Sequence, residues 1–309
     1  MPEPRPILID CDPGVDDAIA LLLAAGTPAV DVRAVTTVAG NLPLPQVTQN
    51  ARLVCALAGL DVPIAAGCDR PLVRDLVTAP IEYHGEAGLG GRNPEGPLAA
   101  LTEGHAVDLI VETVLSAPGQ VTLVPIGPLT NVALALRREP RLAGAVREVV
   151  LMGGSTGRGN QTPAAEFNIF VDPEAAAAVF AAPWKVTMVG LNLTHQAQAT
   201  PEVRAAVGAL SGSAARLAGD LLGYCAAGYP KRGLAGPPIH DACAVARVAD
   251  PSLVGCVPAL IQVETQGRLT SGMTVANLEP TGAGPHLAAA TLEAARFWDL
   301  VVSALTNLP

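Results

Sequence analysis

Short β-branched apolar runs alternate with Ala- and Leu-rich stretches along most of the chain. The β-branched runs predict strands at Ile7–Ile9, Val32–Val38, Val62–Ala65, Val121–Pro125, Glu148–Met152 and Lys185–Leu191. The Ala- and Leu-rich stretches predict helices at Asp17–Ala25, Gln46–Ala58, Ala106–Leu115, Leu129–Arg137, Pro173–Ala181, Pro201–Leu210 and Asp241–Val248. Strands that alternate with helices predict an α/β fold, with a parallel sheet covered by helices on both faces. The strands are continuously apolar, which fits burial on both faces.

Three segments are rich in Gly and Pro or lack periodicity, namely 66–104, 153–170 and 228–239. Long irregular segments in a compact domain are usually functional, so we expect them to form the loops of an active site. We find no repeat and no linker with a shift in composition, which predicts one domain over residues 1–309. Leu260–Val263 and a final helix at Leu292–Leu305 are expected to complete the domain at the edge of the sheet.

Composition narrows the classes of partner. The formal net charge is −9, whereas nucleic acids and anionic membranes require a basic surface, so we expect neither as a partner. No apolar stretch has the length of a membrane helix, and the N-terminal sequence MPEPRPILID lacks the pattern of a signal peptide. The six cysteines contain no CxxC pair and mostly lie in apolar segments, which predicts reduced thiols in a cytoplasmic protein.

Four carboxylates stand between the first strand and the first helix, in the sequence ILIDCDPGVDDAIALLL at residues 7–23. Asp10 and Asp12 follow the strand directly, at the edge where open parallel sheets bind their ligands. A structural explanation is available, because Pro13 suits the first helical position and Asp12 before it is a possible N-cap.

Capping needs only one acid, however, and like charges packed together disfavour joint ionisation. Asp16 and Asp17 add two more carboxylates, and no Lys or Arg follows before Arg33. A divalent cation that prefers oxygen ligands, Ca²⁺ or Mg²⁺, would resolve this repulsion. The sequence therefore favours a metal site over a simple helix cap.

A nucleotide or phosphate site is an alternative to this interpretation, and two sequences bear on it. The sequence MGGSTGRGN at 152–160 matches neither GxGxxG nor a phosphate-binding loop. Asp10 and Asp12 after a strand are also similar to haloacid-dehalogenase-like phosphatases, in which the first Asp is the nucleophile. That class has Thr or Val where Gly14 stands and gives Asp16 and Asp17 no role.

Further polar residues fall where strands end. Asn41 ends the sequence TTVAGN, and the carbonyl of Ile126 is exposed where Gly127 and Pro128 break a strand. Glu166 and Asn168 stand two residues apart, so in extended chain both face the same side, as recognition of hydroxyl groups requires. Alone, this pair is better explained as a hydrogen-bonded pair that organises a loop.

Histidines add candidates for proton chemistry. His240 and Asp241 precede an apolar helix, where Asp241 could be only an N-cap and His240 only a partly buried structural residue. His84 lies on the long loop of 66–104, and His195, after the strand at Lys185–Leu191, is ambiguous.

Together these segments resemble one family, the inosine–uridine preferring nucleoside N-ribohydrolases. The similar segments are DCDPGVDDA (10–18), TTVAGN (36–41), EYHGEAGLGG (82–91), VPIGPLTNVALAL (124–136), EVVLMGG (148–154), AEFNIFVDPEAA (165–176), VTMVGLNLTH (186–195) and IHDACAV (239–245). They cover almost the whole chain in order and spacing. The resemblance implies a Rossmann-like, open and mostly parallel sheet, and a Ca²⁺-dependent hydrolase of ribonucleosides that acts as a homodimer or homotetramer.

The resemblance also implies roles for individual residues. Calcium would be bound by Asp12, Asp17, Asp241 and the carbonyl of Ile126. Asp12 would also be the general base for a calcium-bound water, and His240 would help the leaving base depart. Asp10 would orient the calcium ligands without binding the metal itself. The residues implied to contact the nucleoside are Asp16, Asn41, His84, Met152, Asn160, Glu166, Asn168 and Tyr229.

The chain departs from the family pattern at two positions. Ile126 stands where Thr is common, which leaves the backbone carbonyl unchanged as a ligand. Cys225 stands where some members have an aromatic residue, although Tyr224 and Tyr229 remain. This second departure concerns the choice between purine and pyrimidine bases, which the sequence leaves open. The alternative function is a catalytically silent ribose- or nucleoside-binding protein on the same scaffold, which would need Asn41, Glu166 and Asn168 without the full acidic turn.

Overall fold

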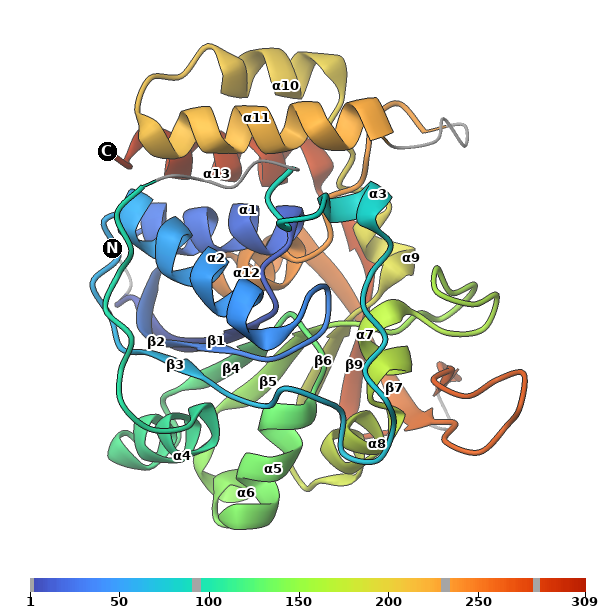
Figure 1. The fold of residues 1–309 in the computed structure, drawn as a ribbon. Coiled ribbons are helices and arrows are strands. Elements are labelled where there is room, and N and C mark those ends of the chain that lie inside the picture. Colours follow the sequence, from blue (N-terminus) through green and yellow to red (C-terminus); the bar gives the residue numbers. More distant parts are fainter. Residues whose placement is uncertain (1–2, 91–95, 229–233, 280–283) are drawn as a thin grey trace.

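The computed structural model describes residues 3–90, 96–228, 234–279 and 284–309. Within these residues, nine strands form one sheet in the order β3-β2-β1-β4-β5-β6-β9-β7-β8 (Figure 1). Their bounds are β1 Arg5–Cys11, β2 Val30–Thr37, β3 Ile64–Ala66, β4 Thr122–Pro125, β5 Glu148–Met152, β6 Val186–Val189, β7 Val254–Val263, β8 Thr274–Asn277 and β9 His286–Leu292.

The first six strands are all parallel, and their order 3-2-1-4-5-6 is that of a doubly wound nucleotide-binding sheet. β9 continues the parallel sheet beside β6, whereas β7 pairs antiparallel with both β9 and β8. The predicted mostly parallel α/β sheet is therefore confirmed. The strand order reverses between β1 and β4, and ligands of such sheets bind outside the carboxyl ends at this point.

Helices cover both faces of the sheet (Figure 1). Their bounds are α1 Val15–Gly26, α2 Leu44–Leu57, α3 Ile81–His84, α4 Ala106–Ser116, α5 Thr130–Arg138, α6 Leu142–Ala145, α7 Phe167–Val171, α8 Pro173–Ala181, α9 Leu191–Thr194, α10 Pro201–Gly208, α11 Ser213–Gly228, α12 Ala242–Ala249 and α13 Ala294–Thr306. Side chains alternate across a strand, so Ile7 and Ile9 of β1 pack in the core with α1 and α12, and Leu8 packs in the other core with α4 and α5.

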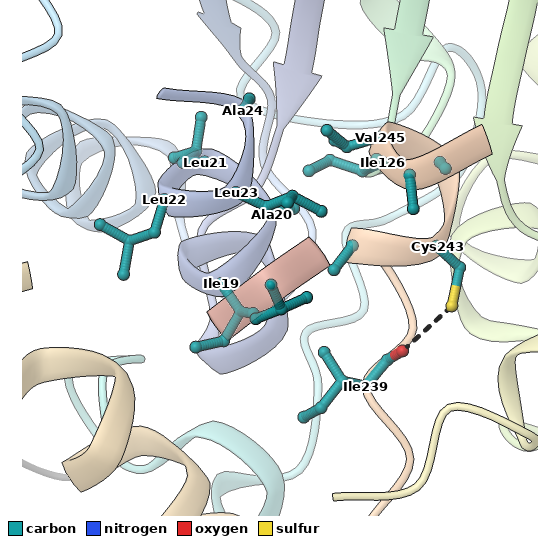
Figure 2. Packing of buried hydrophobic residues seen from close by; sticks show 14 of the residues in the cluster. Ile19, Ala20, Leu21, Leu22, Leu23, Ala24, Ile126, Ile239, Cys243 and Val245 are labelled. Carbon is teal, nitrogen blue, oxygen red and sulfur yellow. Dashed lines mark hydrogen bonds between the residues drawn. The ribbon is translucent and has the colours of Figure 1, made fainter. Parts of the chain in front are cut away.

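Helix α1 lies deepest in its layer and sets the position of the acidic turn. Leu21, Leu22 and Leu23 are consecutive and all buried, because α2, α11, α12 and α13 surround the helix. Figure 2 shows α1 beside Val245 of α12 and Ile126, with Cys243 donating a hydrogen bond to the carbonyl of Ile239 at 3.4 Å. Helix α12 packs against α1, which brings Asp241 beside Asp16 and Asp17 from a distant part of the chain.

Some elements differ from the predictions. The long α11 was not predicted, because its Gly and Ser residues interrupt the apolar periodicity, and β9 was also missed. The final helix α13 packs on α1 rather than at the sheet edge, because its buried residues Phe297, Trp298 and Val301 face the same core as α1. No helix in the described ranges combines the length and the apolar character that a bilayer crossing needs.

Asp172 anchors the long segment that follows β3. It is fully buried, and its carboxylate accepts hydrogen bonds from the Leu72 amide at 2.8 Å, the Thr130 hydroxyl at 2.7 Å and the Ala175 amide at 3.0 Å. Asp172→Ala leaves these donors without their acceptor, so we expect a loss of about 3 kcal/mol in the free energy of unfolding.

Urea denaturation with Glu174→Ala as the control tests this expectation. Glu174 lies on the same helix, but its ion pair with Arg74 is partly exposed, so its loss should cost about 1 kcal/mol or less. Equal destabilisation by the two variants would contradict the anchoring role of Asp172.

Candidate active site

The turn between β1 and α1 is organised by Asp17. The helix begins at Val15 with Gly14 at the N-cap position. The Asp17 carboxylate accepts the amide hydrogens of Gly14 at 3.0 Å and of Asp12 at 3.1 Å. The structure therefore removes the alternative in which Asp12 caps the helix and Pro13 is its first residue, because the Asp17 side chain reaches back to accept the amide hydrogens of the turn.

Asp12 instead points toward the carboxyl ends of the neighbouring strands. Its Oδ2 accepts the Asn41 amide at 2.6 Å, and its Oδ1 is buried without a hydrogen-bond partner. A Cβ at Gly40 would lie 2.1 Å from Oδ2, and one at Gly127 would lie 2.6 Å from Oδ1. The carboxylate therefore packs against two glycines, and its unpartnered oxygen requires a donor or a cation.

Asp241 occupies the N-cap position of α12 but makes no capping hydrogen bond with its side chain. Its carboxyl group bonds to Asp17 instead, and carboxylate oxygens of Asp16, Asp17 and Asp241 all lie within 4.8 Å of one another. The structure thus removes the interpretation of Asp241 as a simple cap. The group therefore contains Asp16, for which the family resemblance implied a contact with the substrate, and does not contain Asp12.

Burial and the charges of neighbouring carboxylates raise the pKa values of Asp12, Asp17 and Asp241. Burial, and then the charge of Asp17, raises the pKa of Asp12 well above its usual range. Burial and the charge of Asp16 raise the pKa of Asp17 to about 7, and burial followed by the charges of Asp16 and Asp17 raises that of Asp241. Among the described residues, no Lys or Arg forms an ion pair with these acids.

The donor set fits a hard divalent cation. The clustered carboxylates of Asp16, Asp17 and Asp241 offer oxygens alone, and the unpartnered Oδ1 of the neighbouring Asp12 is a further oxygen donor. A bound cation would favour the charged form of each acid. The carbonyl of Ile126 lies beside the set, where it accepts the Asn168 side-chain amide at 2.9 Å and keeps a second lone pair.

A cavity of about 350 Å³ opens above the acidic cluster. The sequence-predicted residues on its wall are Asp16, Asn41, His84, Ile126, Met152, Asn160, Asn168, His240 and Asp241. Asp12, Asp17 and Glu166 are buried behind the wall. Tyr229 lies outside the described residues. The wall also includes Phe167 and His195, and Cys225 is placed there as the departure from the family pattern suggested.

Two histidines on the wall are fixed through Nδ1. The Val15 amide donates to His84 Nδ1 at 3.1 Å, so this nitrogen carries no proton. His240 Nδ1 lies 2.7 Å from the Thr194 hydroxyl, and the ring of His195 meets that of His240 edge-on at 5.8 Å between centroids. Burial lowers the pKa of His84, and it lowers that of His240 to about 4. Both imidazoles are therefore neutral at pH 7.

Glu166 and Asn168 do not lie in extended chain, so the prediction of a shared side is wrong. Glu166 is the N-cap of α7, and its carboxylate accepts amide hydrogens from Asn168 at 2.9 Å, Ile169 at 3.2 Å and Gly154 at 2.9 Å. Asn160 accepts the Phe167 amide at 3.0 Å. These side chains hold the loop after β5, and Asn168 reaches the cavity from the first turn of α7.

The sequence held a partial signal for this helix. Glu before the apolar sequence FNIFV is a possible N-cap, although a helix of 5 residues has too few turns to show periodicity. The link between Thr194 and His240 had no sequence signal, because the two residues are 46 positions apart.

Comparison with known proteins places these features in one family. Residues 7–299 match the family described as inosine-uridine preferring nucleoside hydrolase. The chain is 48% identical to the inosine-uridine preferring nucleoside hydrolase of Crithidia fasciculata, over 99% of this chain and 98% of that protein. It is 45% identical to the pyrimidine-specific ribonucleoside hydrolase RihA of Shewanella woodyi, over 88% of each. The structure of a purine-preferring ribonucleoside hydrolase from Gardnerella vaginalis is similar, with a TM-score of 0.91 and 29% identity over 98% of each chain.

Proposed function

Because the chain belongs to the inosine-uridine preferring nucleoside hydrolase family, we propose that it releases ribose from ribonucleosides with calcium held at its acidic cluster. The observation that supports the metal most directly is the buried, unpartnered Oδ1 of Asp12 beside Asp17 and below a cavity of nucleoside size. Hydrolysis of a neutral substrate also agrees with the net charge of −9.

The proposed calcium ligands are the carboxylates of Asp12, Asp17 and Asp241 and the carbonyl of Ile126. Calcium is proposed over Mg²⁺ on the family resemblance, and the oxygen-only donor set fits it. When bound, calcium would supply a water ligand of lowered pKa and hold hydroxyl groups of the ribose. Asp16 is only half-buried and lies on the cavity wall, so we assign it to a ribose hydroxyl.

Asp12 is the proposed general base. It takes one proton from the attacking water as the oxygen bonds to the anomeric carbon, and the electrons of the broken C–N bond leave with the base. Positive charge develops on the ribosyl ring in this transition state, as in other glycoside hydrolyses. The carboxylates below the cavity stabilise that charge, which is a second reason for their concentration here.

The remaining wall residues are proposed to bind and orient the nucleoside. Asn41 and Asn168 face the ribose with their side-chain oxygens, since the nitrogens of both amides already bind the chain. Asn160 and Glu166 hold the loop that presents Asn168, and Met152 packs beside its amide at 3.5 Å. His84, Cys225 and Tyr229 are assigned to the side of the base.

His240 is proposed to assist the departing base. Its ring is neutral at pH 7, so the assistance takes the form of a hydrogen bond from its N–H to the base as negative charge develops there. We further propose a cytoplasmic homodimer or homotetramer, in keeping with the family resemblance. Light scattering on the purified protein measures the oligomeric state.

Ribose release from uridine, cytidine, inosine and adenosine, each with and without EGTA, tests the proposal. We expect hydrolysis that EGTA abolishes and added Ca²⁺ restores, and the relative rates give the base preference. Tight nucleoside binding without ribose release would instead identify a silent binding protein. Hydrolysis that is insensitive to EGTA would contradict the metal.

A further inference from the structure

We infer that Thr194 is a positioning residue, which orients the His240 ring and keeps its proton on Nε2, facing the base. The inference rests on the proposed function, because it concerns how His240 meets the leaving group. It follows from the hydrogen bond of 2.7 Å between the Thr194 hydroxyl and His240 Nδ1.

The two partners are held in place by their backbones. Thr194 is fully buried at the end of α9, where its amide bonds to the Gly190 carbonyl at 3.1 Å. The segment before His240 is fixed to the chain after α9, because the Ile239 amide donates to the Ala197 carbonyl at 3.0 Å. The hydrogen bond therefore joins two short segments whose separation is set by the fold, and little freedom is left to the ring.

Burial decides the direction of this hydrogen bond. If Nδ1 donated the proton, the buried Thr194 hydroxyl would keep a hydrogen with no acceptor in the described part of the chain. An unsatisfied buried donor costs about 1–3 kcal/mol, whereas donation from Thr194 to Nδ1 satisfies both groups. The proton of the ring then lies on Nε2.

Nε2 is also the nitrogen available to the substrate. His240 lines the cavity and Nδ1 is occupied by Thr194. The Nε2–H group donates a hydrogen bond to the base, which gains negative charge as it receives the electrons of the C–N bond. Thr194 thus acts through His240 and touches no reacting atom. His84, which also lines the cavity, shows the same arrangement, with the Val15 amide in place of a hydroxyl.

Activity measurements with two leaving groups test the inference. Thr194→Val keeps the shape of the side chain but removes the hydrogen bond, so we expect kcat for inosine to fall by about tenfold to a hundredfold. Nitrophenolate is stable as an anion and needs little hydrogen-bond assistance, so the loss with p-nitrophenyl riboside should be less than about threefold. Thr194→Ser retains the hydroxyl and should restore most of the activity with inosine.

Thr187→Val is the matched control. Thr187 is fully buried on β6, and its hydroxyl has no partner in the described structure, so its replacement should change neither activity by more than about twofold. Equal losses with both substrates for Thr194→Val would indicate a merely structural role and overturn the inference. Full activity with inosine would overturn it as well.

A double-mutant cycle and a spectroscopic measurement complete the test. In a His240→Ala background, Thr194→Val should cost no further activity with inosine, and an additive loss would contradict action through His240. Nitrogen-15 NMR of the 5 histidines should show the His240 proton on Nε2 in the wild-type protein and a mixture of tautomers in Thr194→Val. A proton on Nδ1 in the wild type would refute the inference, while hydrolysis by the wild type would leave the proposed function standing.

Discussion

Replacing Asp12 with Asn is expected to lower kcat for inosine by about a thousandfold or more. The amide cannot accept the proton of the attacking water, and it is a poorer ligand for calcium than a carboxylate. Its side-chain oxygen can still accept the Asn41 amide, so the turn should keep its structure. Steady-state ribose release at saturating inosine and Ca²⁺ measures the effect.

The control for this variant is Asp10→Asn, which removes a buried charge from the same turn. Asp10 accepts hydrogen bonds from Thr36 at 2.6 Å and Asn131 at 2.8 Å and is absent from the cavity wall. Its replacement should cost less than about tenfold, because it only orients the neighbouring chain. In EGTA, Asp12→Asn should melt no lower than the wild type, since the repulsion with Asp17 is gone. Turnover within tenfold of the wild type would refute the general-base role.

Removal of calcium is expected to abolish activity and to make the protein less stable as the pH rises. Burial raises the pKa of Asp10 to about 6 and those of Asp17 and Glu166 to about 7, above the unfolded values near 4. At pH values between the unfolded and the native pKa, the native state binds more protons than the unfolded state. The free energy of unfolding therefore falls as the pH increases. The contribution of these carboxyl groups to the stability of the native state is complete below about pH 4, and it is lost as the pH rises through 6 to 7.

Thermal melting between pH 5 and pH 8, in EGTA and in excess Ca²⁺, measures this effect. The melting temperature in EGTA should fall with increasing pH, and Ca²⁺ should raise it by roughly 5 °C or more at pH 8 and by less at pH 5. The cation favours the charged carboxylates, which are abundant only at the higher pH. An equal calcium effect at both pH values would show that the acidic cluster is not the binding site.

Local sequence predicted most of the regular structure. The bounds of β5 and α8 agree with the predicted Glu148–Met152 and Pro173–Ala181, because short buried strands and Ala-rich helices have strong local signals. Helix α11 was missed, since Gly and Ser weaken its periodicity and its packing against α10, α1 and other helices stabilises it.

The candidate site was predictable in part for the same reason. Asp12, Asp16 and Asp17 are close in the sequence, so their repulsion could be inferred without a structure. Asp241 lies more than two hundred positions away, and the residue pattern alone favoured a helix cap for it. The structure showed that its carboxyl group faces Asp17 and makes no capping bond.

The sequence by itself determined the alternation of strands and helices, the crowding of acids after β1 and the family. The tertiary structure decided which oxygen of Asp12 is left unpartnered and that Thr194 meets His240. It also decided that Asp17, not Asp12, accepts the amide hydrogen of the N-cap residue Gly14. Hydrophobic periodicity is a local property, and it fixes where an element forms. The direction of a polar side chain depends on which distant segments pack beside it, and only the folded sheet and its covering helices bring those segments together.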